Sequence, residues 1–277
     1  MNHHPNAADA VKTQHFAGQK SPIAWVGGKS RLAATIIERL PEHRSYVEPF
    51  AGGAWVLFGK PPSHVEIIND INSELVTLYR CIKHHLSELV AQFKWLLNAH
   101  DEFDRFMATP PETLTDIQRA ARFYYLNKTA FGAKAAGQNY GLTISQPPRL
   151  NLLRLEEDFS AAHLRLHRVQ IENRPYGHII DRCDRDDTLF YLDPPYWGCE
   201  NDYGKLIFER ADFARLAEQL ARIKGKFILS LNDTLGVREV FADFEMEEVK
   251  TRYSMAASSK AKAKSQSTVG ELLIRNF

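Results

Sequence analysis

The sequence predicts an α/β protein with a doubly wound, mostly parallel sheet. Short apolar runs of strand length end in polar or acidic residues, as at residues 45–48, 65–70 and 188–193. Stretches with helical spacing separate most of these runs, which is the pattern of an open α/β sheet. A chain of 277 residues with 44% apolar and 25% charged content can bury one large core that carries an insertion.

Composition and cysteine usage exclude several protein classes. The net charge of +1 neither requires nor excludes a nucleic-acid partner. Cys81, Cys183 and Cys199 lack CxxC spacing, so we expect neither a disulfide framework nor a metal site, and a reducing cytosol fits. No apolar run is long enough to span a membrane, and residues 1–20 lack the apolar centre of a signal peptide. We therefore predict a cytoplasmic protein with a flexible amino-terminal arm.

The first ordered stretch contains Trp25 and the glycine turn Gly27-Gly28-Lys29, and a helical pattern follows it. Two glycines before a helix let backbone N–H groups approach an anion, and Lys29 adds a charge. The alternative is a nucleotide-triphosphate loop, which would need a glycine where this chain has Ile23. We reject that alternative. Taken in isolation, a structural turn with a buried tryptophan would also explain these residues.

Residues 45–48 predict a strand that leads into Glu48-Pro49-Phe50 and then Gly52-Gly53. Glycine permits close approach of the backbone to a ligand, and an acid at a strand end can accept from amine or hydroxyl groups. The spacing does not match the GxGxxG fingerprint of dinucleotide-binding proteins.

Residues 65–69 predict a second strand, with Asp70 at its tip and Asn72 as the N-cap of the next helix. Asp70 follows the glycine turn by about twenty residues, the position from which an acid binds ribose hydroxyls in related folds. A second capping residue is the alternative interpretation of Asp70.

Residues 96–167 predict a mostly helical insertion, with Thr115 as the cap of a helix at residues 116–128. Between Ile117 and Leu155 there is no acid, but there are six basic residues: Arg119, Arg122, Lys128, Lys134, Arg149 and Arg154. Amide groups at Asn127, Gln138 and Asn139 accompany them. This mixture suits phosphate and base-edge contacts. A solvated helical face with a mobile loop is the alternative.

The remaining strands are predicted at residues 168–172, 188–192 and 226–233, followed by a terminal pair at residues 244–253 and 270–277, for a total of seven. A helix is predicted at residues 212–223. The terminal pair flanks a second basic tract with Lys260, Lys262 and Lys264, which is either a DNA-contacting loop or a disordered tether.

The strand at residues 188–192 runs into Asp193-Pro194-Pro195-Tyr196. The two prolines end the strand and stiffen the loop, because neither can donate to a ladder and each restricts the residue before it. Asp193 and the Pro194 carbonyl offer acceptors at the carboxyl end of a strand, beside the aromatic face of Tyr196. This arrangement suits a planar ring that carries an amino group.

Asp193-Pro194-Pro195-Tyr196 resembles the catalytic motif of S-adenosylmethionine-dependent amino-methyltransferases that act on DNA. Trp25-x-Gly27-Gly28-Lys29, Glu48-Pro49-Phe50-x-Gly52 and Asp70-Ile71-Asn72 are similar to further motifs of the Dam-like, D12 class, adenine-N6 family. The chain departs from that family at Ala54, where many members have a second spaced glycine. It departs again after Asn127-Lys128, where a second asparagine is absent.

The resemblance implies a Rossmann-like seven-stranded methyltransferase domain formed by residues 21–95 and 168–277. It implies that residues 96–167 are a target-recognition insertion that binds double-stranded DNA. It further implies that Trp25, Gly27, Gly28, Lys29, Glu48, Pro49, Phe50, Gly52, Gly53, Asp70 and Asp193 bind the methyl donor. Asp193, Pro194, Pro195 and Tyr196 would be catalytic, with no metal required.

The implied reaction is direct methyl transfer from S-adenosyl-L-methionine to N6 of an adenine flipped out of the duplex. Methylation of cytosine N4, of RNA adenine or of a protein amide is the alternative within the same chemistry. A different class of alternative is a DNA-binding module that has lost catalysis. We expect a solitary methyltransferase without a fused nuclease; the sequence indicates neither the target sequence nor an oligomeric state.

Overall fold

The computed structural model describes residues 18–25, 27–130, 138–141, 150–200, 207–251 and 269–277. Most of the predicted amino-terminal arm lies outside these ranges. The same is true of five predicted DNA contacts, namely Lys134, Arg149, Lys260, Lys262 and Lys264.

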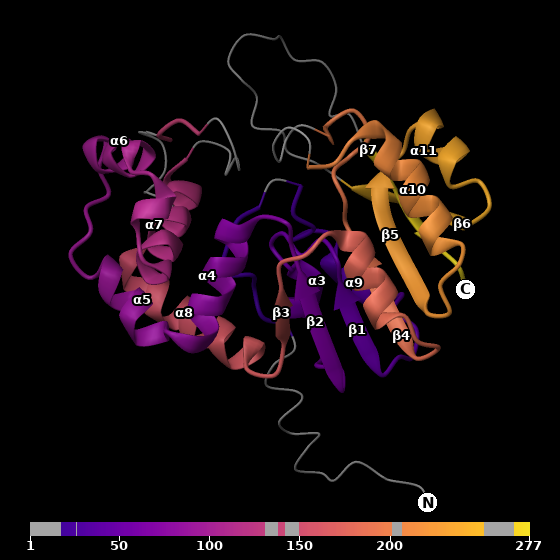
Figure 1. Cartoon of the computed structure of the whole chain (residues 1–277), viewed down its shortest axis with the longest axis horizontal. Helices are drawn as coiled ribbons and strands as arrows, with labels where there is room; N and C mark the ends of the chain where they lie inside the picture. Colours follow the sequence, from indigo (N-terminus) through magenta and orange to yellow (C-terminus); the bar gives the residue numbers. More distant parts are fainter. Residues whose placement is uncertain (1–17, 26, 131–137, 142–149, 201–206, 252–268) are drawn as a thin grey trace, which may run out of the picture.

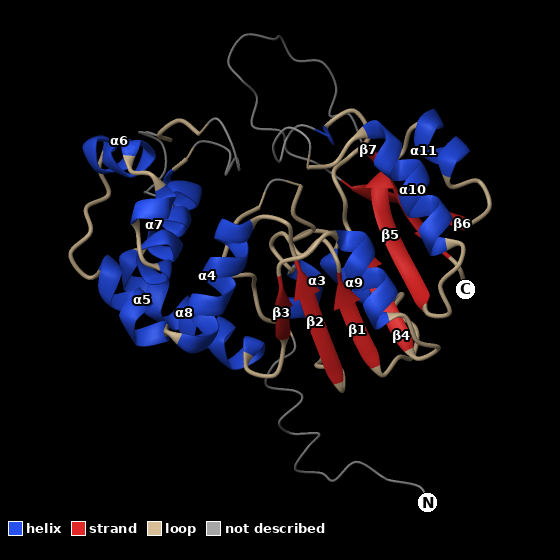
Figure 2. Ribbon diagram, in the orientation of Figure 1, coloured by secondary structure: helices blue, strands red, loops and turns tan. Residues whose placement is uncertain are grey.

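Seven strands form a single sheet in the order β3-β2-β1-β4-β5-β7-β6 (Figure 2). The strands are β1 (Ser45–Glu48), β2 (Val65–Asn69), β3 (Gln170–Glu172), β4 (Thr188–Leu192), β5 (Lys226–Asn232), β6 (Glu245–Thr251) and β7 (Val269–Arg275). The first five strands are parallel, and β7 runs antiparallel between β5 and β6. The predicted α/β sheet of seven strands is confirmed.

Helices are present where the sequence predicted them after Lys29, after Asn72 and at residues 116–128, and the helix predicted at residues 212–223 is shifted. The helices are α2 (Ala33–Ile37), α3 (Trp55–Gly59), α4 (Ser73–His84), α5 (Leu86–Phe93), α6 (His100–Ala108), η1 (Pro111–Thr113), α7 (Asp116–Thr129), α8 (Leu152–Leu166), α9 (Tyr176–Cys183), α10 (Arg210–Leu220) and α11 (Leu235–Val240).

Side-chain caps set several helix ends. The Asn72 side chain accepts from two backbone N–H groups of α4, and Thr115 forms a capping box with Gln118 at the start of α7. Both caps were predicted. By contrast, α10 begins two residues before the predicted start, because Glu209 and Asp212 form a reciprocal cap there. It ends earlier as well, at Leu220, and a few residues later the backbone N–H groups of Lys224 and Gly225 donate to the Asp184 carboxylate.

Both faces of the sheet are covered, and adjacent β1 residues show this. Tyr46 belongs to a hydrophobic cluster on one face, whereas Val47 belongs to a cluster with Phe190, Phe213 and Leu229 on the other. Successive side chains of a strand point to opposite faces, so a parallel sheet covered on both sides needs apolar residues at consecutive positions.

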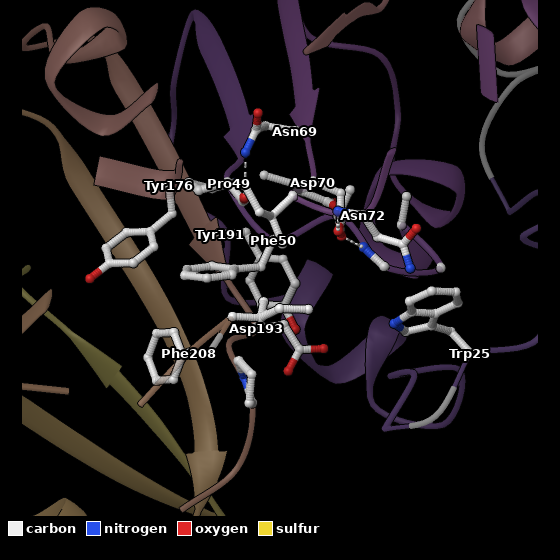
Figure 3. A pocket seen from close by; sticks show the side chains of 18 of the residues that line it. Trp25, Pro49, Phe50, Asn69, Asp70, Asn72, Tyr176, Tyr191, Asp193 and Phe208 are labelled. Carbon is white, nitrogen blue, oxygen red and sulfur yellow. Dashed lines mark hydrogen bonds between the residues drawn. The ribbon is translucent and has the colours of Figure 1, made fainter. Parts of the chain in front are cut away.

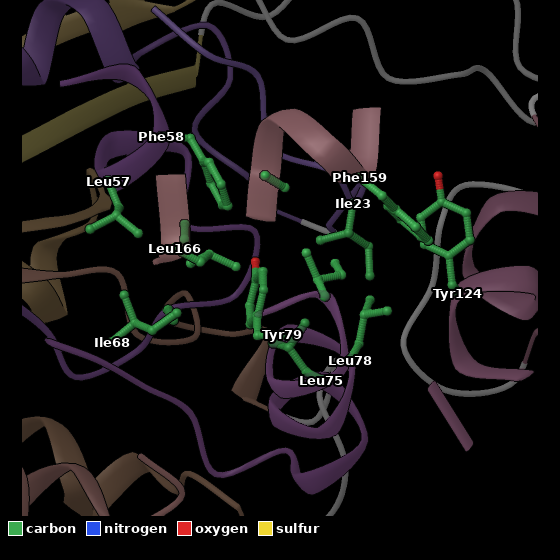
Figure 4. Close-up of a cluster of buried hydrophobic side chains, with 14 of the residues drawn as sticks. Ile23, Leu57, Phe58, Ile68, Leu75, Leu78, Tyr79, Tyr124, Phe159 and Leu166 are labelled. Atoms are coloured by element: carbon green, nitrogen blue, oxygen red, sulfur yellow. The ribbon is translucent and has the colours of Figure 1, made fainter. Parts of the chain in front are cut away.

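Figure 1 shows the helices α4 to α8 gathered beside β3, at the opposite end of the sheet from β6. Helices α4 and α5, which precede residue 96, pack against α7 and α8. The hydrophobic cluster that contains Tyr46 continues from Ile68 on the sheet through Tyr79 to Tyr124 and Phe159 in the helices (Figure 4). The sheet and the helices therefore share one core, and the predicted boundaries at residues 96 and 167 stay a prediction.

Candidate active site

A cavity of about 540 Å³ lies at the carboxyl ends of β1, β2 and β4. The predicted site residues that line it are Trp25, Gly28, Lys29, Glu48, Pro49, Phe50, Gly52, Gly53, Asp70, Asp193 and Pro195. Three others, Gly27, Pro194 and Tyr196, are not among the lining residues. Figure 3 shows Asp193 between Trp25 on one side and a group of aromatic rings on the other. The acid after β4 and the glycine turn after β1 thus share one cavity.

Asp193 is held by two donors from different parts of the chain. Lys29 Nζ donates to its Oδ1 at 2.5 Å, and Ser230 Oγ donates to the same oxygen at 3.3 Å. The Asp193 side chain is 21% exposed. Burial raises the pKa of this carboxyl above its ordinary value, while the ammonium of Lys29 and the hydroxyl of Ser230 oppose the rise. The site therefore holds a partly desolvated carboxyl group with a fixed orientation.

Lys29 connects Asp193 to a second carboxylate. Its buried ammonium lies 3.5 Å from Glu271 Oε1 and 4.5 Å from the centroid of the Tyr196 ring. The Tyr196 hydroxyl donates to Glu271 Oε2 at 2.6 Å. Burial raises the pKa of Glu271, and Lys29 and the Tyr196 hydroxyl oppose it. One ammonium therefore faces two carboxylates, of which Glu271 is fully buried and Asp193 is partly exposed.

Glu48 ends β1 at the cavity wall. Its Oε1 accepts from the Tyr46 hydroxyl at 2.7 Å and from the Leu57 N–H at 2.8 Å. Burial raises the pKa of Glu48 to about 7, although these two hydrogen bonds and the charge of Lys60 lower it. Glu48 consequently ties the end of β1 to α3.

Asp70 joins the glycine turn after β1 to the start of α4. Its Oδ2 accepts from the Gly52 N–H and its Oδ1 from the Asn72 N–H, each at 2.9 Å. Burial raises the pKa of Asp70, and these backbone hydrogen bonds oppose it. The side chain therefore orders the backbone around the cavity, in keeping with the alternative of a capping residue, and also lines the cavity itself.

The glycines leave room for two indole rings. A Cβ on Gly52, which has a φ of +46°, would lie 2.7 Å from Trp25 Cδ1. A Cβ on Gly28 or on Gly53 would lie 2.8 Å from Trp55 Nε1. Ala54, one of the predicted departures, adopts a φ of +48°, a conformation that glycine adopts without strain. The turn is therefore packed tightly against Trp25 and Trp55.

Three aromatic rings form the opposite wall. Phe50 stacks on Tyr176 with ring centroids 5.0 Å apart, and Phe208 lies 5.9 Å from each of them. The Tyr176 hydroxyl donates to Asp212 at 3.4 Å, and burial raises its pKa to about 12. This wall offers flat apolar surface to a planar ligand.

Helix α7 carries four of the predicted DNA contacts that the structure describes. Arg119 pairs with Glu74 and Asp116, and the Arg122 Nε donates to the Phe106 carbonyl at 2.7 Å. The Lys128 ammonium lies 5.2 Å from the Tyr124 ring centroid, and burial lowers its pKa. Asn127 is buried in the same helix.

The predicted amides Gln138 and Asn139 lie in a short segment beside α7. The neighbouring Tyr140 bridges to Ala130 and stacks on His100, with ring centroids 5.0 Å apart. Tyr140 therefore attaches this segment to α6.

Sequence reasoning missed several residues around the cavity. Tyr176 and Phe208 lie outside every recognised motif, and Glu271 lies in a strand that was predicted only as part of the terminal pair. Tyr191 and Ser230 were predicted as strand residues, and their hydroxyls lie 3.0 Å apart beneath Asp193. A polar residue inside an apolar strand, such as Ser230 or Glu271, was the available signal.

Within the described ranges, no group of three or more histidine, cysteine or acidic side chains is placed to hold a metal ion. No helix in these ranges is both long and apolar enough to cross a membrane.

Comparison with known proteins connects this geometry to a family. The chain is 26% identical over 268 residues to the Type II methyltransferase M.CviBI of Paramecium bursaria Chlorella virus NC1A, covering 93% of this chain and 100% of that protein. It is also 26% identical to the DNA adenine methylase of Escherichia coli strain K12, with 91% and 93% covered. The DNA N-6-adenine-methyltransferase of Escherichia phage P1 is 24% identical, over 92% of this chain and 36% of that protein. Residues 25–255 match the D12 class family, so the chain belongs to the N6 adenine-specific DNA methyltransferases of the D12 class.

Proposed function

We propose that this protein transfers a methyl group from S-adenosyl-L-methionine to N6 of adenine in double-stranded DNA, and that Asp193 and the Pro194 carbonyl receive the amine. The observation that carries the proposal is that Asp193 shares its cavity with the glycine turn after β1. Open α/β sheets bind ligands at this edge. We also propose that the enzyme is cytoplasmic, because its three cysteines are free, as in a reducing compartment.

The cavity suits the proposed methyl donor in size and chemistry. Its volume of about 540 Å³ is in the range of small-molecule sites. The rings of Phe50, Tyr176 and Phe208 offer a wall for a purine, and Asp70 offers acceptors for ribose hydroxyls. When bound, the donor supplies an electrophilic methyl group on a sulfonium centre. Its binding residues would be those predicted, together with Tyr176 and Phe208.

Asp193 would stabilise the amine during attack. The lone pair of an adenine amine is delocalised into the ring, which makes the nitrogen a poor nucleophile. Hydrogen bonds from its N–H groups to Asp193 and to the Pro194 carbonyl favour a pyramidal nitrogen. Positive charge that develops there meets acceptors that are already in place, a contribution on the order of a few kcal/mol at comparable sites. The stiff Pro194-Pro195 turn keeps these acceptors oriented.

Lys29 would keep Asp193 ionised. The ammonium opposes the rise in the pKa of Asp193 that burial causes. A protonated carboxyl would lose acceptor capacity towards the amine. Tyr196 would stack on the flipped base, and the proton on nitrogen becomes acidic once the methyl group has been transferred. Asp193 therefore need not be a strong base.

Helix α7 would contact the DNA backbone. Asp116 is its only acid, whereas Arg119, Arg122 and Lys128 are basic. Arg119 already pairs with Glu74 and Asp116, so Arg122 and Lys128 are the stronger candidates for phosphate contact among the described residues of this helix. The predicted contacts outside the described ranges would add to them.

The decisive experiment is methylation of plasmid DNA by the purified protein with radiolabelled S-adenosylmethionine. Nucleoside mass spectrometry should show N6-methyladenine, and sequencing should map the modified positions. The Asp193→Ala variant should bind DNA and produce no methylated base. Wild-type turnover in this variant would refute the catalytic assignment.

Calorimetry with the donor tests the opposing possibility of an inactive DNA-binding module. The wild-type protein should bind the donor with one site per chain. A complete lack of donor binding, combined with normal DNA binding, would support the inactive module instead.

A further inference from the structure

The loop after Asp193 is clamped by a cross-strand pair. Asn232 of β5 lies opposite Glu271 of β7 in the antiparallel register. The Asn232 side chain accepts from the Trp197 N–H at 2.9 Å and donates to the Trp197 carbonyl at 3.0 Å. Glu271 accepts from the hydroxyl of the preceding residue, Tyr196, at 2.6 Å. Two directly paired strand residues thus hold two consecutive loop residues.

Glu271 is the unusual member of this pair. Its side chain is 0% exposed, although carboxylates are almost never fully buried unless they are paired. Its two oxygens face different parts of the site. Oε2 binds the ring hydroxyl of Tyr196, and Oε1 lies 3.5 Å from Lys29 Nζ, which also binds Asp193 at 2.5 Å.

We propose that Glu271 is a positioning residue of the methyl-transfer site, which orients the Tyr196 ring through its hydroxyl and shares Lys29 with Asp193. The inference rests on the proposed function and adds a residue outside the four motifs of the sequence. Glu271 acts through Tyr196 and Lys29 and does not itself contact the base.

The charge balance explains why a carboxylate suits this position. Among the residues that the structure describes, the charged or titratable groups around Asp193 are Lys29, Glu271 on β7, Tyr191 on β4 and Glu48 on β1. Lys29 is the one cation among these groups, and its Nζ lies within 3.5 Å of both Asp193 and Glu271. Removal of the Glu271 charge would take away one of the two carboxylates that face Lys29 and one negative charge near Asp193, so the pKa of Asp193 should fall.

A double-mutant cycle tests the link to the ring. Glu271→Gln and Tyr196→Phe each disturb the same hydrogen bond, so each should lower kcat on the order of tenfold. The double variant should be no slower than the slower single variant, because both changes remove one shared interaction. Multiplied losses, on the order of a hundredfold in the double variant, would overturn the proposal.

The pH profile of kcat tests the link to Lys29. In Glu271→Gln, the acid limb should move to lower pH. Asp193 should ionise more easily when the negative charge of Glu271 no longer competes for the Lys29 ammonium. Tyr196→Phe removes no charge at neutral pH, so its acid limb should coincide with that of the wild type. An acid limb that does not move in Glu271→Gln would contradict the shared role of Lys29.

Controls separate positioning from folding and from the function itself. Glu248→Gln makes the same change on the adjacent strand β6, at an exposed side chain, and should behave as wild type.

If thermal melting shows that Glu271→Gln is unfolded, Glu271→Asp replaces it in the cycle. That variant keeps the charge but retracts the carboxylate from the hydroxyl, so kcat should fall while the acid limb stays in place. Normal N6 methylation by the wild type with a multiplicative cycle would reject this inference alone.

Discussion

Lys29 Nζ donates to Asp193 Oδ1 at 2.5 Å across a separation of 164 residues in the sequence. The glycine turn before α2 and the loop after β4 therefore meet through a single ion pair. Lys29 is buried, so this pair is poorly screened by solvent. The charge at residue 29 should consequently control the ionisation of the acid at residue 193.

Lys29→Met should move the acid limb of the kcat profile to higher pH. Without the ammonium, the pKa of Asp193 rises further above its ordinary value, so the carboxylate is lost at a higher pH. At pH 7 we expect kcat to fall on the order of tenfold or more. Lys224→Met, at the opposite edge of the sheet, is the matched control. An unmoved limb in Lys29→Met would separate the two residues functionally.

Gly52→Ala should weaken donor binding and reduce stability. The left-handed φ of +46° costs an alanine about 1–2 kcal/mol, and its Cβ would meet Trp25 at 2.7 Å. Calorimetry should show donor affinity reduced on the order of tenfold or more, because the turn and Trp25 both line the cavity. Gly18→Ala has a comparable φ of +80° with no atom within 4 Å of the added Cβ, so it isolates the backbone cost. Equal donor affinity in the two variants would contradict this prediction.

Glu48→Gln should flatten the dependence of stability on pH. The pKa of Glu48 in the folded state is about 7, above its ordinary value of 4.5, so the folded state binds more protons between these values. The wild type should therefore lose free energy of unfolding as the pH rises from 4.5 to 7, by about 3 kcal/mol from this residue. The glutamine can still accept from Tyr46 and Leu57. Urea unfolding at several pH values measures the difference, and parallel curves for the two proteins would refute it.

Glu66→Ala should destabilise the protein by about 3–5 kcal/mol. Glu66 is buried between Lys60 Nζ at 2.6 Å and Arg165 Nη1 at 2.5 Å, and its loss leaves two buried cations without their carboxylate. Glu245→Ala removes the exposed partner of Arg275 and should cost below about 1 kcal/mol. Urea unfolding of both variants tests the contrast, which disappears if the two losses are equal.

Lys128→Ala and Arg122→Ala should each weaken DNA binding without changing donor affinity. Affinity falls with salt, and the loss of one phosphate contact should make the slope of log affinity against log salt shallower by about 1. Fluorescence anisotropy at several salt concentrations gives this slope. Arg185→Ala changes the net charge by the same amount, but Arg185 lies in the exposed turn before β4, away from the cavity. This variant should keep the wild-type slope. Unchanged slopes in both α7 variants would remove the evidence for DNA contact by this helix.

Local sequence patterns predicted the elements well where they depend on neighbours in the chain. The Asn72 cap needs only the next three residues, and the capping box of Thr115 and Gln118 is equally local. The end of α10 was predicted less well. The backbone that leaves this helix is bound at Lys224 by Asp184, which lies 40 residues earlier in the chain.

The same distinction applies to the candidate site. Asp193, Asp70 and the Gly52-Gly53 turn stand just after apolar strands, and the carboxyl ends of parallel strands meet at one edge of a sheet. Their shared cavity could therefore be predicted. Tyr176, Phe208 and Glu271 do not stand at a strand end. The place of Tyr176 and Phe208 at the cavity depends on how α9 and the segment before α10 pack, and the contact of Glu271 with Tyr196 depends on how β7 packs.

The sequence by itself determined the strand and helix pattern, the motifs at the strand ends and the chemistry they suit, because periodicity and turn residues act over a few positions. Only the tertiary structure decided that Glu271 would hold Tyr196, that Lys29 would lie between two carboxylates and that Arg119 would be matched by Glu74. Such pairs form between residues far apart in the chain, and the packing of the sheet and helices selects them.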